Sequence, residues 1–358
     1  MPWPSAAPHR TICISGISAF LSLCLGTPGR RVQARAPATG LDAAVRATQP
    51  LRLDAESTLG DLLHHPAFTG FERLLLPWDD RAYDEQMPLT RIGSLLPYHT
   101  HVDAATVANA LNRLIDEAAG GKTVFYRFYS DAQVQQDPAK AKTGLFFFRG
   151  RPGASFAVIA PGGGFSYVAS VHEGFPYAET ISREGYNAFV LKYRVGSGGG
   201  PAIQDLAAAV SYIFANAAAL DVDTGGYSLW GSSAGARMAA SIGSHGVSRF
   251  GGTDLPGPSA VVMAYTGHSD HAAHEPPTFV VVGEDDGIAP PVTMKRRVEA
   301  LRKAGTEVEY REYPGVGHGF GLGVGTRAEG WISDAIQFWN RSRAELRERA
   351  RPARRRPP

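Results

Sequence analysis

Residues 226–243 read GYSLWGSSAGARMAASIG, and this stretch decides the fold class. GYSLWG is a short apolar run typical of a strand that is buried on both faces, and AGARMAASIG is composed mostly of helix-forming residues. Between them, Gly231 and Gly235 flank Ser233 in the pattern G-x-S-x-G. Glycines on both sides permit a sharp turn from a strand into a helix, which exposes the serine hydroxyl. The stretch predicts a strand–turn–helix unit with Ser233 at the turn.

Ser233 is a candidate nucleophile because of this setting. A serine hydroxyl is a weak nucleophile, so it needs exposure, a neighbouring base and electrostatic help. The start of the helix would place the Ala234 N–H and the positive end of the helix dipole beside a developing oxyanion. The alternative is a non-catalytic serine in a glycine-rich turn, since the pattern G-x-S-x-G also occurs by chance. Ser232 occupies a variable position of the pattern, and we expect it to be structural.

Strand-like and helix-like segments alternate on both sides of this unit. The predicted strands are 123–130, 143–150, 156–160, 187–194, 226–231, 260–267, 278–283 and 308–314. The predicted helices are 102–121, 174–185, 202–219, 233–245, 291–304 and 327–345. This order predicts an α/β fold with a mostly parallel β-sheet flanked by helices on both faces. The short segment between 260–267 and 278–283 leaves no room for a large lid.

Three glycines, Gly162 to Gly164, follow the strand predicted at 156–160. Such a run lets bare backbone N–H groups converge on an anion, as in the oxyanion hole of the HGGG type. Pro161 stands where that motif has His, but the donors are backbone groups, so the exchange should leave the hole intact. A flexible loop is the alternative. A phosphate cradle is disfavoured because no Lys-Ser/Thr pair follows.

Carboxylates and a histidine follow the last two predicted strands. Asp285 and Asp286 come directly after TFVVVG, and His318 lies in a glycine-rich loop after VEYREYP. A histidine can take the proton of Ser233, and a carboxylate can hold the imidazole in the right tautomer and stabilise the imidazolium. We prefer Asp286 to Asp285 as this carboxylate, and the residues alone leave both open.

Several motifs together resemble one branch of the α/β-hydrolase superfamily, the acetyl-xylan and feruloyl esterases (BD-FAE-like). They are GGGFSYVA, HEGFPYA, LKYRVG, GSSAGARMAA, GEDDGIA and YPGVGHGFGLG, and the resemblance covers about residues 120–340. It implies the α/β-hydrolase fold, a triad of Ser233, Asp286 and His318, and an oxyanion hole formed by Gly163, Gly164 and Ala234. The family's G-x-x-D spacing from Gly283 also favours Asp286.

The expected reaction is hydrolysis of short-chain or carbohydrate-linked (acetyl or feruloyl) carboxylic esters through an acyl-enzyme intermediate, without a cofactor or metal ion. A serine peptidase, another acyl-transfer enzyme on the same fold and a non-catalytic binding module are the alternatives. The expected partner is a small-molecule or carbohydrate ester. The net charge of +2 gives no indication of nucleic-acid binding.

Other polar residues have weaker signals. His268, Asp270, His271, His274 and Glu275 gather in the loop after 260–267, where they form either a solvated rim of the pocket or a metal site. Two further pairs stand out: Arg194 with Asp205, which we expect to form an ion pair, and His172 with Glu173, which could line the pocket.

The ends of the chain have compositions of their own. Residues 1–36 contain an apolar run and an Ala34-x-Ala36 cleavage pattern, which predict a signal peptide and a secreted or periplasmic protein. The alternatives are a lipid anchor at Cys24 and a buried helix. Both cysteines, Cys13 and Cys24, lie in this segment, so a processed chain would have no disulfide. The further divisions are an N-terminal extension of uncertain structure at 37–120, a catalytic domain at 121–343 without a transmembrane segment, and a basic disordered tail at 344–358.

Overall fold

The computed structural model of this protein describes residues 51–349. The predicted signal peptide at 1–36, Cys13 and Cys24 therefore lie outside the described residues, as does the end of the chain from residue 350. None of the described helices is long and apolar enough to cross a membrane.

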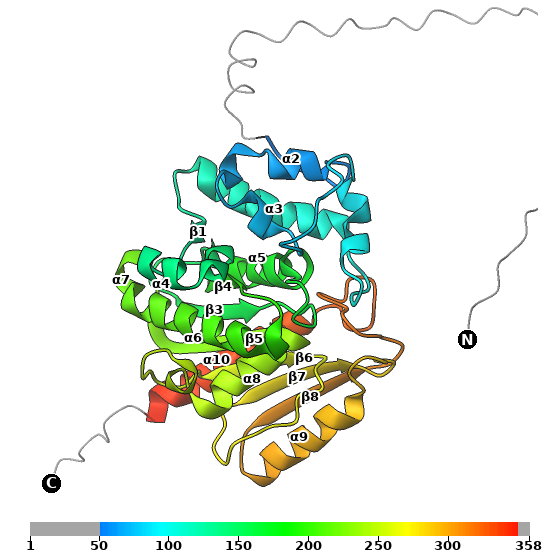
Figure 1. Ribbon diagram of the computed structural model, residues 1–358. Coiled ribbons are helices and arrows are strands. Elements are labelled where there is room, and N and C mark those ends of the chain that lie inside the picture. Colours follow the sequence, from blue (N-terminus) through cyan, green and yellow to red (C-terminus); the bar gives the residue numbers. More distant parts are fainter. Residues whose placement is uncertain (1–50, 350–358) are drawn as a thin grey trace, which may run out of the picture. The chain divides into compact units, whose positions relative to one another are not determined.

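The described residues form one eight-stranded sheet (Figure 1). The strands are β1 Phe125–Tyr126, β2 Gly144–Phe148, β3 Ser155–Ala160, β4 Asn187–Lys192, β5 Asp223–Ser232, β6 Ala260–Ala264, β7 Thr278–Gly283 and β8 Val308–Tyr313. Their order is β1-β2-β4-β3-β5-β6-β7-β8, with β1 and β2 antiparallel to their neighbours and β3 to β8 parallel. The predicted α/β fold with a mostly parallel sheet is confirmed.

The central strands β2, β3, β4, β6 and β7 are buried at every position because they are mostly apolar, whereas the edge strand β8 (VEYREY) is only partly buried. Successive side chains of a strand point to opposite faces, so Phe279 and Val281 of β7 belong to one hydrophobic core, and Val280 and Val282 belong to the other. Continuous apolar runs such as TFVVVG are therefore what a sheet between two helical layers requires.

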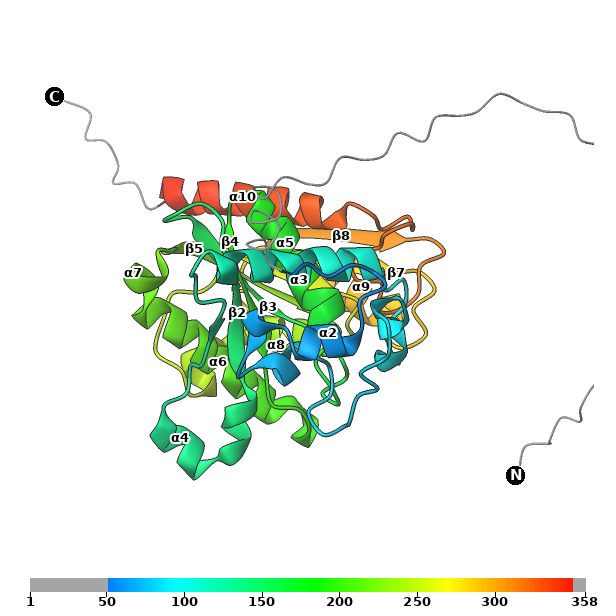
Figure 2. The ribbon, with the colours of Figure 1, turned by 90° about the horizontal axis from the view of Figure 1, so that it is seen from above.

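Two layers of helices cover the sheet. One face carries α5 Phe175–Arg183, α10 Trp331–Arg349 and α3 Ala104–Ala119, which Figure 2 shows gathered on one side. The other carries α6 Gly200–Ala215, α8 Ala234–His245 and α9 Pro291–Lys303. Shorter elements join them: α4 Asp131–Gln136, η4 Pro138–Lys142, the π-helical turn η5 Ser170–Gly174, η6 Ser197–Gly199, α7 Ala217–Leu220 and η7 Ser248–Phe250.

Three predicted elements have other bounds in the structure. The helix expected over 202–219 is divided into α6 and α7, because Asn216 leaves the helical conformation with φ −114° and ψ 16°. The helix expected over 327–345 begins at Trp331 and continues through Arg349, so the segment assigned to the tail from residue 344 begins as the last turns of α10. The strand expected over 123–130 is only Phe125–Tyr126.

Residues 51–103 fold into short helices that pack on the helical layer of α3 and α5. They are α2 Leu59–Leu63, η1 Pro66–Phe68, η2 Glu72–Leu75 and η3 Leu89–Leu95. Leu75 and Leu89 are fully buried in the same core as the sheet. The buried Lys192 at the end of β4 donates to Leu76 O (2.9 Å) and pairs with Asp79 (2.9 Å). The extension, which the sequence left unassigned, is thus tied to the sheet.

Candidate active site

Ser233 lies at the turn between β5 and α8, in a backbone conformation that few non-glycine residues adopt. Its φ is 51° and its ψ is −116°, and its N–H donates to Ala264 O at 2.8 Å. Such a conformation costs about 1–3 kcal/mol, and surrounding packing must hold it. The turn places the serine side chain at the edge of a cavity, as the sequence predicted.

The glycines of the G-x-S-x-G pattern are required by close backbone approach. A Cβ on Gly235 would lie 1.8 Å from Ala160 O in β3, and a Cβ on Gly231 would lie 2.3 Å from the carbonyl of Gly235. No side chain fits at either position, because real atoms do not approach so closely. Both glycines therefore let α8 begin directly against the sheet.

The structure brings the predicted triad together. His318 Nε2 lies 3.0 Å from Ser233 Oγ, and His318 Nδ1 lies 2.7 Å from Asp286 Oδ2. A carboxylate only accepts hydrogen bonds, so Asp286 holds the proton on Nδ1 and leaves Nε2 free to accept from the serine. These distances are those expected of a base that is oriented to take the serine proton.

Asp286, and not Asp285, is the carboxylate that reaches the imidazole. Asp286 is 3% exposed, and its Oδ1 accepts the N–H groups of Ile288 (2.9 Å) and Ala289 (2.7 Å). These two bonds fix the carboxylate so that Oδ2 faces His318. Asp285 is exposed to solvent on the same loop.

The glycine loop that was predicted to contribute to the oxyanion hole lies beside Ser233. A Cβ on Gly162 would come within 3.0 Å of Ser233 Cβ, and Gly164 and Ala234 line the same cavity as the serine. Gly163 and Gly164 have φ values of 126° and 63°, which favour glycine. Within residues 51–349, the N–H groups of Gly163, Gly164 and Ala234 have no hydrogen-bond acceptor. The N–H groups of Gly164 and Ala234, which lie at the same cavity as the nucleophile, are therefore available to an oxyanion, and the Gly163 N–H follows on the same loop.

A buried carboxylate, Glu173, anchors the glycine loop from behind. Its Oε2 accepts the Gly162 N–H, and its Oε1 accepts the hydroxyl of Tyr265 at 2.7 Å. His99 Nε2 lies 2.9 Å from the same Oε1. Burial opposes ionisation of Glu173, but the charge and hydrogen bond of His99 outweigh it and lower the pKa of Glu173 to about 2. The carboxylate is therefore ionised at neutral pH.

The loop that carries His318 is fixed by the N-terminal extension and by η5. Thr100 donates through Oγ1 to His318 O (2.9 Å) and through its N–H to Gly319 O (3.0 Å). His172 Nε2 lies 3.0 Å from Gly319 O and donates to it. Burial, together with the charge of His99, lowers the pKa of His172 to about 4. His172 and Glu173 are therefore buried supports of the site and are not part of the lining of the cavity beside Ser233.

Sequence reasoning missed His99 and Thr100, which lie in a stretch without a periodic pattern. Their place became visible only through contacts with Glu173 and His318. The sequence holds no local signal for these contacts, because Thr100 and His318 are 218 positions apart.

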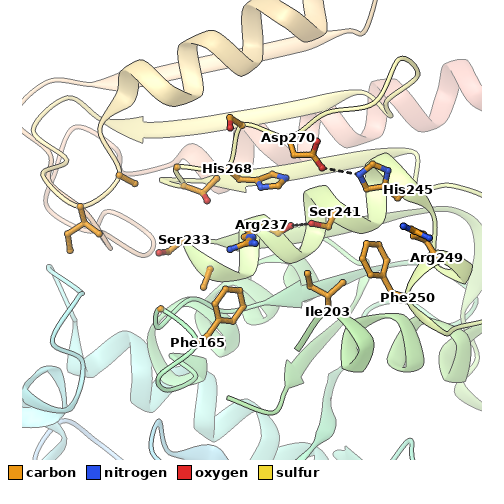
Figure 3. A pocket seen from close by; sticks show the side chains of 17 residues that line it. Phe165, Ile203, Ser233, Arg237, Ser241, His245, Arg249, Phe250, His268 and Asp270 are labelled. Atoms are coloured by element: carbon orange, nitrogen blue, oxygen red, sulfur yellow. Dashed lines mark hydrogen bonds and ion pairs between the residues drawn. The ribbon is translucent and has the colours of Figure 1, made fainter. Parts of the chain in front are cut away.

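A cavity of about 780 Å³ opens beside Ser233 and extends along α8 (Figure 3). Phe165, Ile203 and Phe250 supply apolar side chains, and the polar side chains include Arg237, Ser241, His245, Arg249, His268 and Asp270. The connection from β6 to β7, residues 265–277, contains no helix that would form a lid.

The remaining candidates have structural partners. Arg194 pairs with the buried Asp205 at 2.7 Å, which confirms the predicted ion pair. In the loop after β6, Glu275 binds the buried Arg297 at 2.6 Å, and Asp270 pairs with His245 at 3.0 Å. The described residues contain no cluster of His, Cys, Asp and Glu side chains arranged to hold a metal ion.

Comparison with known families matches two segments of the chain. Residues 153–254 match the BD-FAE family model, and residues 258–344 match the model of the prolyl oligopeptidase family. The chain is also similar to an acetylxylan esterase of Xylanibacter ruminicola, with 22% identity over 236 residues that cover 58% of this chain and 49% of the relative. The chain thus spans about half the length of that relative.

Solved structures with similar folds include three hydrolases. MGS-M1, an α/β hydrolase from a deep-sea metagenome library, is 24% identical with a TM-score of 0.48 and covers 56% of this chain and 93% of its own. An esterase of Thermogutta terrifontis with bound butyrate is 21% identical with a TM-score of 0.46, covering 60% and 92%. A sugar hydrolase of Lactococcus lactis is 19% identical with a TM-score of 0.49, covering 57% and 96%.

Proposed function

Because the chain has the α/β-hydrolase fold and its central segment matches the BD-FAE model, we propose that it is a serine hydrolase of carboxylic esters. The observation that carries the proposal is the hydrogen-bonded chain from Asp286 through His318 to Ser233. This series of hydrogen bonds ends at Ser233, which lies in a strained turn beside a cavity. N–H groups without an acceptor within residues 51–349 lie beside it as well.

The proposed reaction proceeds through two acyl transfers. His318 Nε2 takes the proton of Ser233 while Oγ bonds to the ester carbonyl carbon, and the resulting oxyanion accepts hydrogen bonds from Gly163, Gly164 and Ala234. Collapse breaks the bond to the alcohol, which leaves with the proton from His318. Water then repeats these steps on the acyl-enzyme and releases the carboxylic acid. Asp286 remains a carboxylate and stabilises the imidazolium throughout.

For the substrate we propose short-chain or carbohydrate-linked esters, of which acetyl and feruloyl esters are the expected examples. The similarity to an acetylxylan esterase supports this class. The polar, lidless cavity supports it as well, because a site for long acyl chains would need a larger apolar surface.

A second candidate is a serine peptidase, favoured by the match of residues 258–344 to the prolyl oligopeptidase family. The matched segment contains Asp286 and His318 but not Ser233, and this pair serves ester and amide hydrolysis equally. A peptidase would cleave peptide anilides, whereas an esterase would cleave esters and leave the anilides intact.

The test is a panel of acetyl, butyryl, feruloyl and long-chain 4-nitrophenyl esters together with peptide 4-nitroanilides, assayed with the wild type and Ser233→Ala. We expect the highest kcat/KM on the short esters and no activity in the variant. Preference for the anilides would make the chain a peptidase. Absence of activity on the whole panel would refute the proposed function.

We also propose that the protein is exported, on the basis of the sequence of residues 1–36 alone. Mass spectrometry of the protein from its native host should find a mature N-terminus near residue 37. A protein that retains Met1 in the cytosol would refute export, and a lipid on Cys24 would replace cleavage by anchoring.

A further inference from the structure

We propose that the cavity beside Ser233 selects ester substrates that carry a carboxylate, with Arg237 as the group that binds it. The inference rests on the proposed ester hydrolysis and names the substrate class of the same site. It is carried by two guanidinium groups in the wall of the cavity that have no ion-pair or hydrogen-bond partner within residues 51–349.

Arg237 is placed by the helix that begins at the nucleophile. Residues four apart lie on the same face of an α-helix, and Ser233, Arg237, Ser241 and His245 follow at this interval and all line the cavity. Figure 3 shows Arg237 between Ser233 and Ser241. Four residues correspond to a rise of about 6 Å, so Arg237 lies about one helical turn along α8 from the reacting serine.

Arg237 and Arg249 are solvent-exposed residues that line the cavity. Within residues 51–349, neither guanidinium group forms an ion pair or donates a side-chain hydrogen bond. The buried Arg297 of α9, by contrast, binds Glu275 at 2.6 Å. An unpaired arginine in a cavity wall can bind an anion without first giving up a protein partner.

The charges of the other lining residues do not offset these two cations. Asp270 is the single carboxylate among the lining residues, and it accepts a hydrogen bond from His245 at 3.0 Å. Burial, and after it the positive charges of Arg297 and Arg237, lower the pKa of His268 to about 4, so this imidazole is neutral at neutral pH. With one carboxylate against two guanidinium groups, the lining residues leave the cavity wall with an excess of positive charge.

A carboxylate matches this wall better than a neutral polar group does. The planar guanidinium binds carboxylates through two parallel N–H bonds. Phe165, Ile203 and Phe250 line the cavity as well and can pack against a short carbon skeleton. The substrate is therefore an ester with a carboxylate a few carbons from the scissile carbonyl, either on the acyl side, as in a dicarboxylic monoester, or on the alcohol side, as in an acetylated uronate.

The experiment compares charged and neutral esters in matched pairs. One pair is the 4-nitrophenyl monoester of adipic acid and its methyl-capped form. The other is an acetylated methyl glucuronide and an acetylated methyl glucoside. The kcat/KM ratio of charged to neutral ester is measured for the wild type, Arg237→Gln, Arg237→Lys and Arg296→Gln, with the rate without enzyme subtracted. Arg296 is the matched control, an exposed arginine of α9 outside the cavity lining.

We expect the wild type to prefer the charged ester in at least one pair, and that pair identifies the side that carries the carboxylate. Arg237→Gln should lower the ratio by about tenfold or more, Arg237→Lys should lower it less, and Arg296→Gln should leave it unchanged. A wild type that hydrolyses the neutral esters without preferring the charged ones would overturn this inference alone, as would a ratio insensitive to Arg237→Gln. A wild type without activity on any ester would instead overturn the proposed function.

Discussion

Replacing Asp286 by Asn should stop the reaction through the wrong tautomer of His318, although the exchange is nearly isosteric. In the structure, Oδ1 of Asp286 accepts the N–H groups of Ile288 and Ala289 at 2.9 and 2.7 Å. An Asn side chain must keep its oxygen toward these two donors, so its NH₂ group would face His318 Nδ1. An imidazole that accepts at Nδ1 carries its proton on Nε2, and this nitrogen then cannot accept the proton of Ser233.

The magnitude follows from the loss of the base. The same replacement in the chymotrypsin triad lowers kcat by about 10⁴, which corresponds to about 5 kcal/mol of transition-state stabilisation. Asp286 is buried and bonded to His318 Nδ1 at 2.7 Å. We therefore expect a loss of the same order, and little change in stability because the backbone bonds remain.

The matched control is Asp285→Asn, the adjacent carboxylate on the exposed side of the loop. Both variants are assayed with 4-nitrophenyl acetate at one pH near 8, after circular dichroism and thermal denaturation have shown them to be folded. Asp285→Asn should keep kcat within about threefold of the wild type, since exposed substitutions have small effects.

Two results would refute this reasoning. A severe loss in Asp285→Asn with a mild one in Asp286→Asn would move the orienting carboxylate to Asp285. Mild losses in both variants would mean that the third member of the triad is neither residue.

Three further predictions concern the support of the site. Gly235→Ala should lower the free energy of unfolding by about 3 kcal/mol or prevent folding, because the new Cβ would lie 1.8 Å from a carbonyl oxygen of β3. The control is Gly257→Ala, where a Cβ would have no atom within 4 Å, and it should leave the melting temperature unchanged. Glu173→Ala should destabilise the protein by about 3–5 kcal/mol and reduce kcat, because the Gly162 N–H and a buried ion pair lose their carboxylate; wild-type stability in urea and unchanged kcat would contradict this. Because the pKa of His172 is lowered from 6.5 to about 4, the unfolded chain binds this proton at higher pH than the folded one. The contribution of His172 to the free energy of unfolding is therefore full above pH 6.5 and falls toward pH 4, by at most about 1.4 kcal/mol per pH unit. Urea unfolding of His172→Gln between pH 4 and 6.5 should show a free energy of unfolding that depends less steeply on pH than that of the wild type. The same slope in both proteins would exclude His172 as the source of the pH dependence.

Most strands were predictable because their signal is local, although the strand expected over 123–130 is only Phe125–Tyr126. A strand buried on both faces must be apolar along its length, and TFVVVG satisfies this without reference to any other segment. Helix ends were less predictable, because α6 ends at Asn216 and α10 continues past residue 345 through interactions that no sequence pattern marks.

The N-terminal extension could not be predicted for a related reason. Its short 3₁₀ helices have no hydrophobic period of their own, and they are held by burial of residues such as Leu75 and Leu89 against the main core. The contacts of His99 and Thr100 with the site depend on that packing.

The place of Arg237 could be predicted from the sequence only in part. Its position four residues after Ser233 on a predicted helix placed it on the face of the nucleophile, so the sequence held the signal. Only the structure, however, added the cavity and the lack of a partner for its guanidinium group within the described residues.

The central claim is that Ser233 is the nucleophile, and covalent trapping tests it most directly. The wild type is treated with paraoxon, which transfers a diethyl phosphoryl group to an activated serine, and the adduct is located by peptide mass spectrometry. We predict one adduct, on Ser233, formed in step with loss of esterase activity, and no adduct in Ser233→Ala. An adduct on another residue that accounts for the lost activity, or a Ser233→Ala variant that still hydrolyses esters at a substantial fraction of the wild-type kcat, would contradict the account.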